Sequence, residues 1–318
     1  MSLEVATAVL LSLLRHSGIA VVVQTTLCSI FLITTEILAP VFFSKRRIQP
    51  GTAKFPHLRH ELIHAFVTLV SGGIIGYLLE TLKDSGHIVL DETGPCTADN
   101  TTAQETIGGD FPTETNSCTV SSYAQFGARI ALEVFGYFVL FDAYFYWGHR
   151  LFHTPALYFL HRPHHVSTAP NAVAAFSFNP VEGTIFGAFF PFSLLAWTWI
   201  GGGFHFYSMV LMGFLQGLQS LLIHSGYEFF PAWVFKYRLT AAFLTPTFHD
   251  RHHEFQRCNF AGFFTWWDDL CGTNDGDDWR NKYHTWYTKG RRARPAGGAA
   301  AGAGAADDGG DTASKKAD

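Results

Sequence analysis

Residues 183–225 run for 43 positions without an Asp, Glu, Lys or Arg side chain. Because a helix needs about 20 apolar residues to cross the hydrocarbon core of a bilayer, this segment is about twice the length of one crossing. Three consecutive glycines, Gly201-Gly202-Gly203, stand near its middle and are typical of a tight turn. The segment therefore predicts a hairpin of two membrane helices.

The composition also favours a membrane protein. Only 15% of the residues are charged, against about 25% in a typical soluble domain, and 48% are hydrophobic. The net charge of −4 gives no basic excess of the kind that binds nucleic acid, so we expect no nucleic-acid partner. Further apolar segments are residues 19–43, which contain Glu36, and residues 62–79. Residues 123–147 contain three charges, and we expect them to form a helix that enters or skirts the membrane.

Loop composition predicts the side of the membrane on which each loop lies. Lys45-Arg46-Arg47 mark the first loop as cytosolic by the positive-inside rule. Residues 83–122 are acidic and contain a glycosylation sequon at Asn100 together with Cys96 and Cys118, which suits an oxidising lumen. A disulfide between these two cysteines is a weaker hypothesis. Counting spans from these loops places every histidine motif on the cytosolic side.

The two ends of the chain are predicted to lie outside the bundle. Residues 1–14 contain Glu4 and no early positive charge, which favours a short interfacial helix over a cleaved signal peptide. Residues 289–318 are rich in Gly, Ala and Asp and predict a disordered tail. The tail ends in Lys315-Lys316-Ala317-Asp318, which resembles the cytosolic dilysine signal of endoplasmic reticulum membrane proteins. We therefore expect a multi-pass protein of that membrane.

Nine of the 16 histidines fall in four motifs between positions 149 and 253. Residues 149–153 read HxxxH, residues 161–165 and 249–253 read HxxHH, and one histidine stands alone. Side chains three and four residues apart share a helix face, and the third ring of each HxxHH motif can reach a second ion. Nine imidazoles suit two first-row transition metals. The predicted metal ligands are His149, His153, His161, His164, His165, His224, His249, His252 and His253.

The pattern favours oxygen chemistry over other metal functions. None of the four motifs reads HExxH, which argues against a zinc protease centre built from them. A zinc transporter would place its histidines at mid-membrane, whereas these motifs stand at or beyond the ends of the predicted spans. A lone HxxxH motif is usually two surface histidines, but the two HxxHH motifs weaken that interpretation. We interpret the group as an O₂-activating di-iron centre that oxidises a C–H bond of a lipid.

The residues around these motifs resemble the fatty acid hydroxylase (sterol desaturase) superfamily of membrane oxygenases over roughly residues 125–275. His224-Ser-Gly-Tyr-Glu228 looks most like C-4 methylsterol oxidases, and Ala175-Phe-Ser-Phe-Asn179-Pro180 is nearer to C-5 sterol desaturases. The family commonly has a histidine where this chain has Asn179, so either the site has one imidazole fewer or this position is not a ligand. The strings that carry the resemblance are Asp142-Ala-Tyr-Phe-Tyr-Trp-Gly-His149, the two HxxHH motifs and Trp266-Trp267-Asp268.

The resemblance implies two iron ions, O₂ as co-substrate, a sterol or related lipid as substrate, and electrons from cytochrome b5 or its NAD(P)H reductase. The expected fold is an all-α integral membrane helical bundle of about four spans with a cytosolic cap of histidine-bearing helices. Its expected parts are N-terminal membrane helices at 1–124 with a lumenal loop at about 83–122, a catalytic region at 125–288, and the tail at 289–318.

Three carboxylates stand where they can orient a ligand imidazole. Asp142 is seven residues before His149 on the same helix face, Glu228 is four residues after His224, and Asp250 follows His249. Rival functions remain at this stage. A fatty-acyl, sphingoid-base or ether-lipid hydroxylase would share all nine histidines, a metal transporter would carry ions without reductant, and a non-catalytic scaffold would not need them.

Overall fold

The computed structural model describes residues 3–43, 46–49, 55–95, 119–235 and 237–275. The predictions for Asn100, Cys96, Cys118 and the tail at 289–318 lie outside the described residues. Within them the chain is mostly helical, as predicted, and five helices are long and apolar enough to cross a membrane. These segments are Thr25–Phe42, Leu58–Asp84, Val120–Phe152, Pro180–Gly201 and Phe206–Ile223.

The first helix begins earlier in the chain than predicted. Helix α1 (Leu3–Ile33) is continuous, so the separate short helix expected at 1–14 is wrong. Gly18 is the residue in this stretch that weakens a helix, and one glycine costs only about 1 kcal/mol. A π-helical turn (Thr34–Leu38) then leads into α2 (Ala39–Phe42), whose Pro40 cannot donate a main-chain hydrogen bond.

The predicted hairpin is confirmed. Helix α6 (Pro180–Gly201) is followed by the C-cap residue Gly202, whose φ of 82° is left-handed, a conformation that glycine adopts at little cost. The chain then forms the two-residue strand β2 (Phe204–His205) and enters α7 (Phe206–Ile223). Strand β2 pairs in parallel with β1 (Leu90–Asp91), which follows α3 (Leu58–Asp84). The tip of the hairpin therefore lies beside the end of α3.

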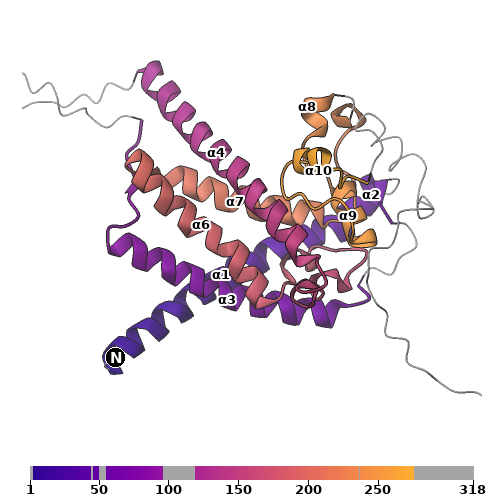
Figure 1. The fold of residues 1–318 in the computed structure, drawn as a ribbon, viewed down its shortest axis with the longest axis horizontal. Helices are drawn as coiled ribbons and strands as arrows, with labels where there is room; N and C mark the ends of the chain where they lie inside the picture. Colours follow the sequence, from indigo (N-terminus) through magenta and orange to yellow (C-terminus); the bar gives the residue numbers. More distant parts are fainter. Residues whose placement is uncertain (1–2, 44–45, 50–54, 96–118, 236, 276–318) are drawn as a thin grey trace, which may run out of the picture.

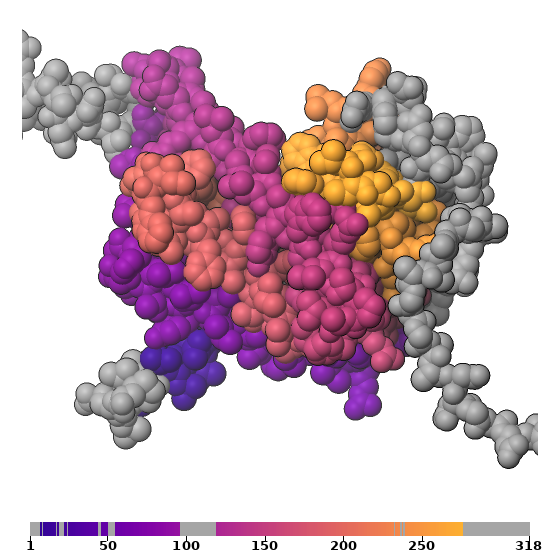
Figure 2. All heavy atoms as spheres, in the orientation of Figure 1, coloured from indigo at the N-terminus to yellow at the C-terminus, as the bar shows by residue number. Residues whose placement is uncertain are grey.

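The long helices run alternately in opposite directions, and different elements lie at the two ends of the bundle (Figure 1). The strand pair lies at one end. At the other end meet the last residues of α4 (Val120–Phe152), the first residues of α6, and the last residues of α7. The short helices α5 (Tyr158–His161), α8 (Arg238–Ala241), α9 (Pro246–Phe255) and α10 (Trp266–Cys271) cap this second end. In the space-filling view, atoms of α9 and α10 lie directly against those of α4 (Figure 2).

Two of the charges in α4 are paired at the strand end of the bundle. Arg129 donates to the carboxylates of Asp91 and of Glu133, and Glu133 is buried. Glu133 also accepts the main-chain N–H of His205 at 3.1 Å. Because buried ionisable groups are costly without partners, this network explains how α4 carries charges and still packs as a long apolar helix.

Candidate metal centre

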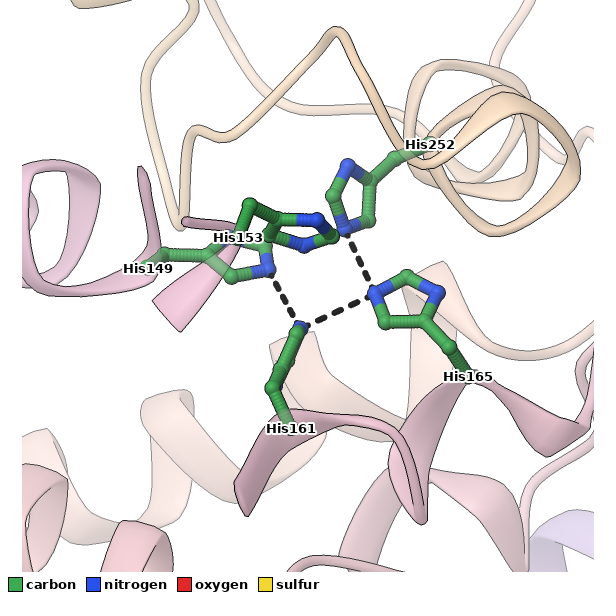
Figure 3. Close-up of side chains that lie close together, drawn as sticks. All are labelled: His149, His153, His161, His165 and His252. Carbon is green, nitrogen blue, oxygen red and sulfur yellow. Dashed lines mark hydrogen bonds between the residues drawn. The ribbon is translucent and has the colours of Figure 1, made fainter. Parts of the chain in front are cut away.

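The structure gathers all nine histidines of the four motifs into two groups at the capped end of the bundle. We call them site A (His149, His153, His161, His165 and His252) and site B (His164, His224, His249 and His253). In each group one ring nitrogen per residue lies within 4.8 Å of all the others. The rings of site A point toward one another from three separate segments (Figure 3).

Both HxxHH motifs are divided between the two sites. The first and last histidines of each motif enter one site, and the middle histidine enters the other. In α9 this follows from helix geometry, because residues i and i+4 share a face and residue i+3 is turned away from residue i+4 by about 100°. Residues 161–165 do not form one helix, since α5 ends at His161 and a 3₁₀ turn begins at His164. The first motif gives two ligands to site A and one to site B, and the second motif gives one to site A and two to site B.

Five of the nine imidazoles donate a hydrogen bond away from the sites through Nδ1. Four of the acceptors are main-chain carbonyls at 2.7–2.9 Å, and a carbonyl oxygen can only accept. A neutral ring that donates from Nδ1 carries its lone pair on Nε2. The pairs are His149 with Phe260, His224 with Ser220, His252 with Cys258, His253 with Ser167, and His161 with the carboxylate of Glu182.

The Nε2 atoms inside each site have the spacing of metal ligands. Three neighbouring pairs lie 2.9–3.0 Å apart in site A and three lie 3.0–3.4 Å apart in site B. Lone pairs that face each other at this distance repel. A metal held about 2.0–2.1 Å from each nitrogen places its ligands about 2.9–3.4 Å apart. The donor set therefore fits a transition metal in each site.

Burial keeps these imidazoles neutral at physiological pH. Loss of solvation lowers the pKa of His161, His165 and His252 in site A well below the usual value. In site B it lowers the pKa of His249 and His253 in the same way, and that of His224 to about 4. Neutral imidazole is the form that binds metals, so the apolar surroundings favour ligation.

Glu182 is a site residue that the sequence analysis did not identify. Its Oε1 accepts the Nδ1 hydrogen of His161 at 2.6 Å, both side chains are buried, and its Oε2 has no hydrogen-bond partner among the described residues. Asn179 explains its position. The Asn179 Oδ1 accepts the N–H of Val181 at 2.9 Å and so begins α6, which puts Glu182 in the first helical turn. Asn179 thus caps a helix in this chain.

The three carboxylates predicted to orient imidazoles bind other groups instead. Asp142 accepts the main-chain N–H groups of Phe263 and Phe264 and the indole N–H of Trp266. Glu228 accepts main-chain N–H groups at residues 230 and 247, and Asp250 accepts the side-chain amide of residue 49. Helix spacing alone suggested imidazole partners, but main-chain carbonyls accept from Nδ1 of His149 and His224, and Nδ1 of His249 has no hydrogen-bond partner among the described residues. Of the three, Glu228 binds the first turn of α9, which carries His249.

Residues far before the histidine motifs also close over the sites. Gln49 donates to Asp250 at 2.7 Å and to the carbonyl of Thr168 at 2.9 Å. Glu61 of α3 is buried and accepts from Ser167, whose carbonyl receives the Nδ1 hydrogen of His253. The first loop and α3 therefore help to fix site B.

A cavity of about 330 Å³ lies against both sites. It touches two histidines of site A and three of site B, so both groups face the same space. Phenylalanines and glycines form most of its wall, and no acidic or basic side chain of the described chain lines it except the imidazoles. Its phenylalanines are Phe141, Phe145, Phe176, Phe178, Phe186 and Phe263. The arrangement can hold an uncharged apolar molecule beside two metal ions.

Comparison with known protein families gives a match over part of the chain. Residues 134–273 match the model of the fatty acid hydroxylase family, and this region contains all nine histidines. No solved structure gives a significant match.

Similar curated proteins are sterol oxidases and desaturases. The chain is 32% identical to C-4 methylsterol oxidase erg25 of Schizosaccharomyces pombe over 139 residues, which are 43% of this chain and 45% of the relative. It is 34% identical to methylsterol monooxygenase erg25B of Aspergillus fumigatus, over 43% of this chain and 46% of the relative. For Delta(7)-sterol 5(6)-desaturase ERG3B of Gibberella zeae the identity is 31%, over 46% of this chain and 42% of the relative. The chain thus spans less than half the length of these relatives. Residues 134–273, which contain both histidine sites, therefore match the fatty acid hydroxylase family.

Proposed function

We propose that this protein is a membrane-bound di-iron oxidoreductase that uses O₂ to oxidise a C–H bond of an uncharged lipid, most directly a sterol. The observation that carries the proposal is the convergence of nine imidazole nitrogens on two points beside one apolar cavity. Imidazole ligands suit iron, and two such sites facing one space allow two ions to act on one substrate. The nine histidines are the proposed ligands, five in site A and four in site B.

Each group of residues has a separate task in this proposal. Bound iron supplies O₂ activation strong enough to remove hydrogen from an unactivated C–H bond. Glu182 and the main-chain carbonyls hold the Nδ1 hydrogens outward, which keeps the Nε2 lone pairs directed into the sites. The phenylalanine wall orients the lipid and excludes water from the reacting carbon.

The cavity and the relatives together support the choice of substrate. A cavity without Lys or Arg favours an uncharged molecule over a free fatty acid or a phosphorylated one. The curated relatives are named for sterols, which makes a sterol the first candidate, oxidised as by a C-4 methylsterol oxidase or a sterol desaturase. A fatty-acyl, sphingoid-base or ether-lipid hydroxylase is the alternative within the family. Sterol and sphingolipid profiles of a knockout separate the two.

Electrons must come from another protein in this scheme. We propose cytochrome b5 or its NAD(P)H reductase as the donor and the endoplasmic reticulum membrane as the location, with the capped end of the bundle on the cytosolic side. Reconstitution of the purified chain with cytochrome b5, its reductase and NADH in liposomes tests the donor. A lack of NADH-dependent O₂ consumption in the presence of a sterol mixture would contradict it.

Metal analysis of the purified protein tests the proposal most directly. We expect about two iron atoms per chain after anaerobic purification from iron-supplemented cells, and a large loss of iron in His165→Ala and His253→Ala. The matched control is His87→Ala, because His87 is exposed and belongs to neither site. A wild-type protein without iron would refute the di-iron proposal, and metal flux into liposomes without reductant would indicate a transporter.

A further inference from the structure

Four polar side chains other than histidine line the cavity, and three of them are already engaged. Thr68, Gln219 and Ser220 each donate to a main-chain carbonyl, at 2.9, 3.3 and 3.2 Å. These hydrogen bonds therefore link the side chains to the main chain of neighbouring segments. The fourth is Gln216, on α7, whose hydrogen bonds follow a different pattern.

Gln216 is held by its oxygen and leaves its nitrogen free. The Oη of Tyr137 donates to Gln216 Oε1 at 2.8 Å, and Tyr137 is itself buried in α4. This bond fixes the orientation of the amide, and Gln216 Nε2 has no hydrogen-bond partner among the described residues. An amide donor that faces an apolar cavity loses free energy unless an acceptor reaches it. Gln216 Nε2 is therefore a hydrogen-bond donor on a cavity-lining residue that is available to a ligand.

The surface of α7 on either side of Gln216 is open. Gly213, Gln216, Ser220 and His224 are spaced by three or four residues and Gly217 is four residues after Gly213, so they form one stripe that leads to site B. A Cβ added at Gly213 or Gly217 would meet no atom within 4 Å. The eight residues from Gln216 to His224 correspond to about 12 Å along the helix axis. The stripe thus offers a slot along which Ser220 and His224 donate to main-chain carbonyls, whereas Gln216 Nε2 has no partner among the described residues.

We infer that Gln216 binds an uncharged oxygen of the lipid substrate, through a hydrogen bond from its side-chain amide, while the apolar body of the lipid lies against Gly213 and Gly217. The oxygen is that of a hydroxyl, ether or carbonyl group. A carboxylate or phosphate does not fit, because the cavity has no cationic side chain to balance it. This inference rests on the proposed function, since it treats the cavity as the substrate site.

Equilibrium binding of matched lipid pairs tests the inference without turnover. The full chain is purified in detergent and kept anaerobic without reductant, so that no oxidation occurs. Tritiated cholestanol and cholestane form one pair, and octadecanol and octadecane form the other. Wild type is compared with Gln216→Leu and with Gln219→Leu, a matched control on the same helix whose side chain lines the same cavity.

We expect wild type to bind one of the alcohols more tightly relative to its hydrocarbon than Gln216→Leu does, by about two- to tenfold for one hydrogen bond. Gln219→Leu should keep the wild-type ratio. The pair that responds identifies a ring lipid or a chain lipid. An unchanged ratio in Gln216→Leu for both pairs would overturn the inference.

A second variant keeps the test decisive if Gln216→Leu does not fold. Tyr137→Phe removes the hydroxyl that orients the amide, so the alcohol-to-hydrocarbon ratio should fall part of the way. An unchanged ratio in this folded variant would also overturn the inference. Loss of the ratio with normal iron content separates a failure here from a failure of the di-iron proposal, which the metal analysis reports independently.

Discussion

Glu182 Oε1 lies 2.6 Å from His161 Nδ1, and both side chains are buried. A carboxylate behind an imidazole fixes the ring tautomer and raises the basicity of the metal-binding nitrogen. The sequence places these residues 21 positions apart, in different helices. The pair links the start of α6 to site A.

Replacing Glu182 should weaken metal binding without removing the site. Glu182→Gln keeps an acceptor for His161 but loses the charge, so we expect about a 10- to 100-fold lower iron affinity. Glu182→Leu loses the acceptor as well and should be worse. Competition of the iron-loaded protein with a graded series of chelators measures the change. Equal affinity in wild type and Glu182→Leu would show that the carboxylate does not position His161.

Acid should release the metal and destabilise the fold together. Burial lowers the pKa of His224 from 6.5 to about 4, and those of His249 and His253 also fall. An unfolded histidine gains its proton as the pH drops through about 6.5, while the folded site still excludes it. The stability from these rings is therefore complete above pH 6.5 and is lost as the pH falls toward 4. Iron content and unfolding temperature measured from pH 7.5 to 4 should decline together, and a flat profile would contradict this.

Filling the slot on α7 should block the lipid and leave the metal sites intact. Gly217 lines the cavity, and a leucine side chain there would occupy the space beside Gln216. We expect Gly217→Leu to lose at least about tenfold in oxidation rate while it keeps the wild-type iron content. Gly72→Leu is the control, because Gly72 has open space around it and does not line the cavity. Product analysis and metal analysis on the same preparations give both readouts.

The charge network at the strand end should matter for stability and not for metal binding. Arg129→Leu leaves the buried Glu133 carboxylate without its cation, which should lower the free energy of unfolding by about 1–3 kcal/mol. Adding Glu133→Gln should recover part of the loss, since a neutral amide is cheaper to bury. Thermal unfolding of the three proteins in one detergent gives the comparison. Equal unfolding temperatures in wild type and Arg129→Leu would contradict this prediction.

Hydropathy and spacing predicted the membrane helices and the Gly201-Gly202-Gly203 turn, because each depends on local sequence. The gathering of the histidines is a long-range feature, and the number of metal-ligating motifs predicted it. The partition of the histidines did not follow from spacing. Residues 161–165 change from an α-helical turn to a 3₁₀ turn between His161 and His164, and the three-dimensional path of that loop decides which ring enters which site. Glu182 and Glu61 are brought to the histidine sites by the packing of α6 and α3, and the periodicity of the sequence does not encode that packing.

Each HxxHH segment contributes to both sites, which couples the two ions mechanically. An ion bound at site A would be held by residues 161–165 and α9, and both segments also carry ligands of site B. The second ion would then bind to segments that the first ion has already ordered. It would lose less conformational entropy on binding, so metal uptake should be cooperative. Singly loaded molecules should therefore be scarce at every iron concentration, and the protein should pass almost directly from empty to doubly loaded.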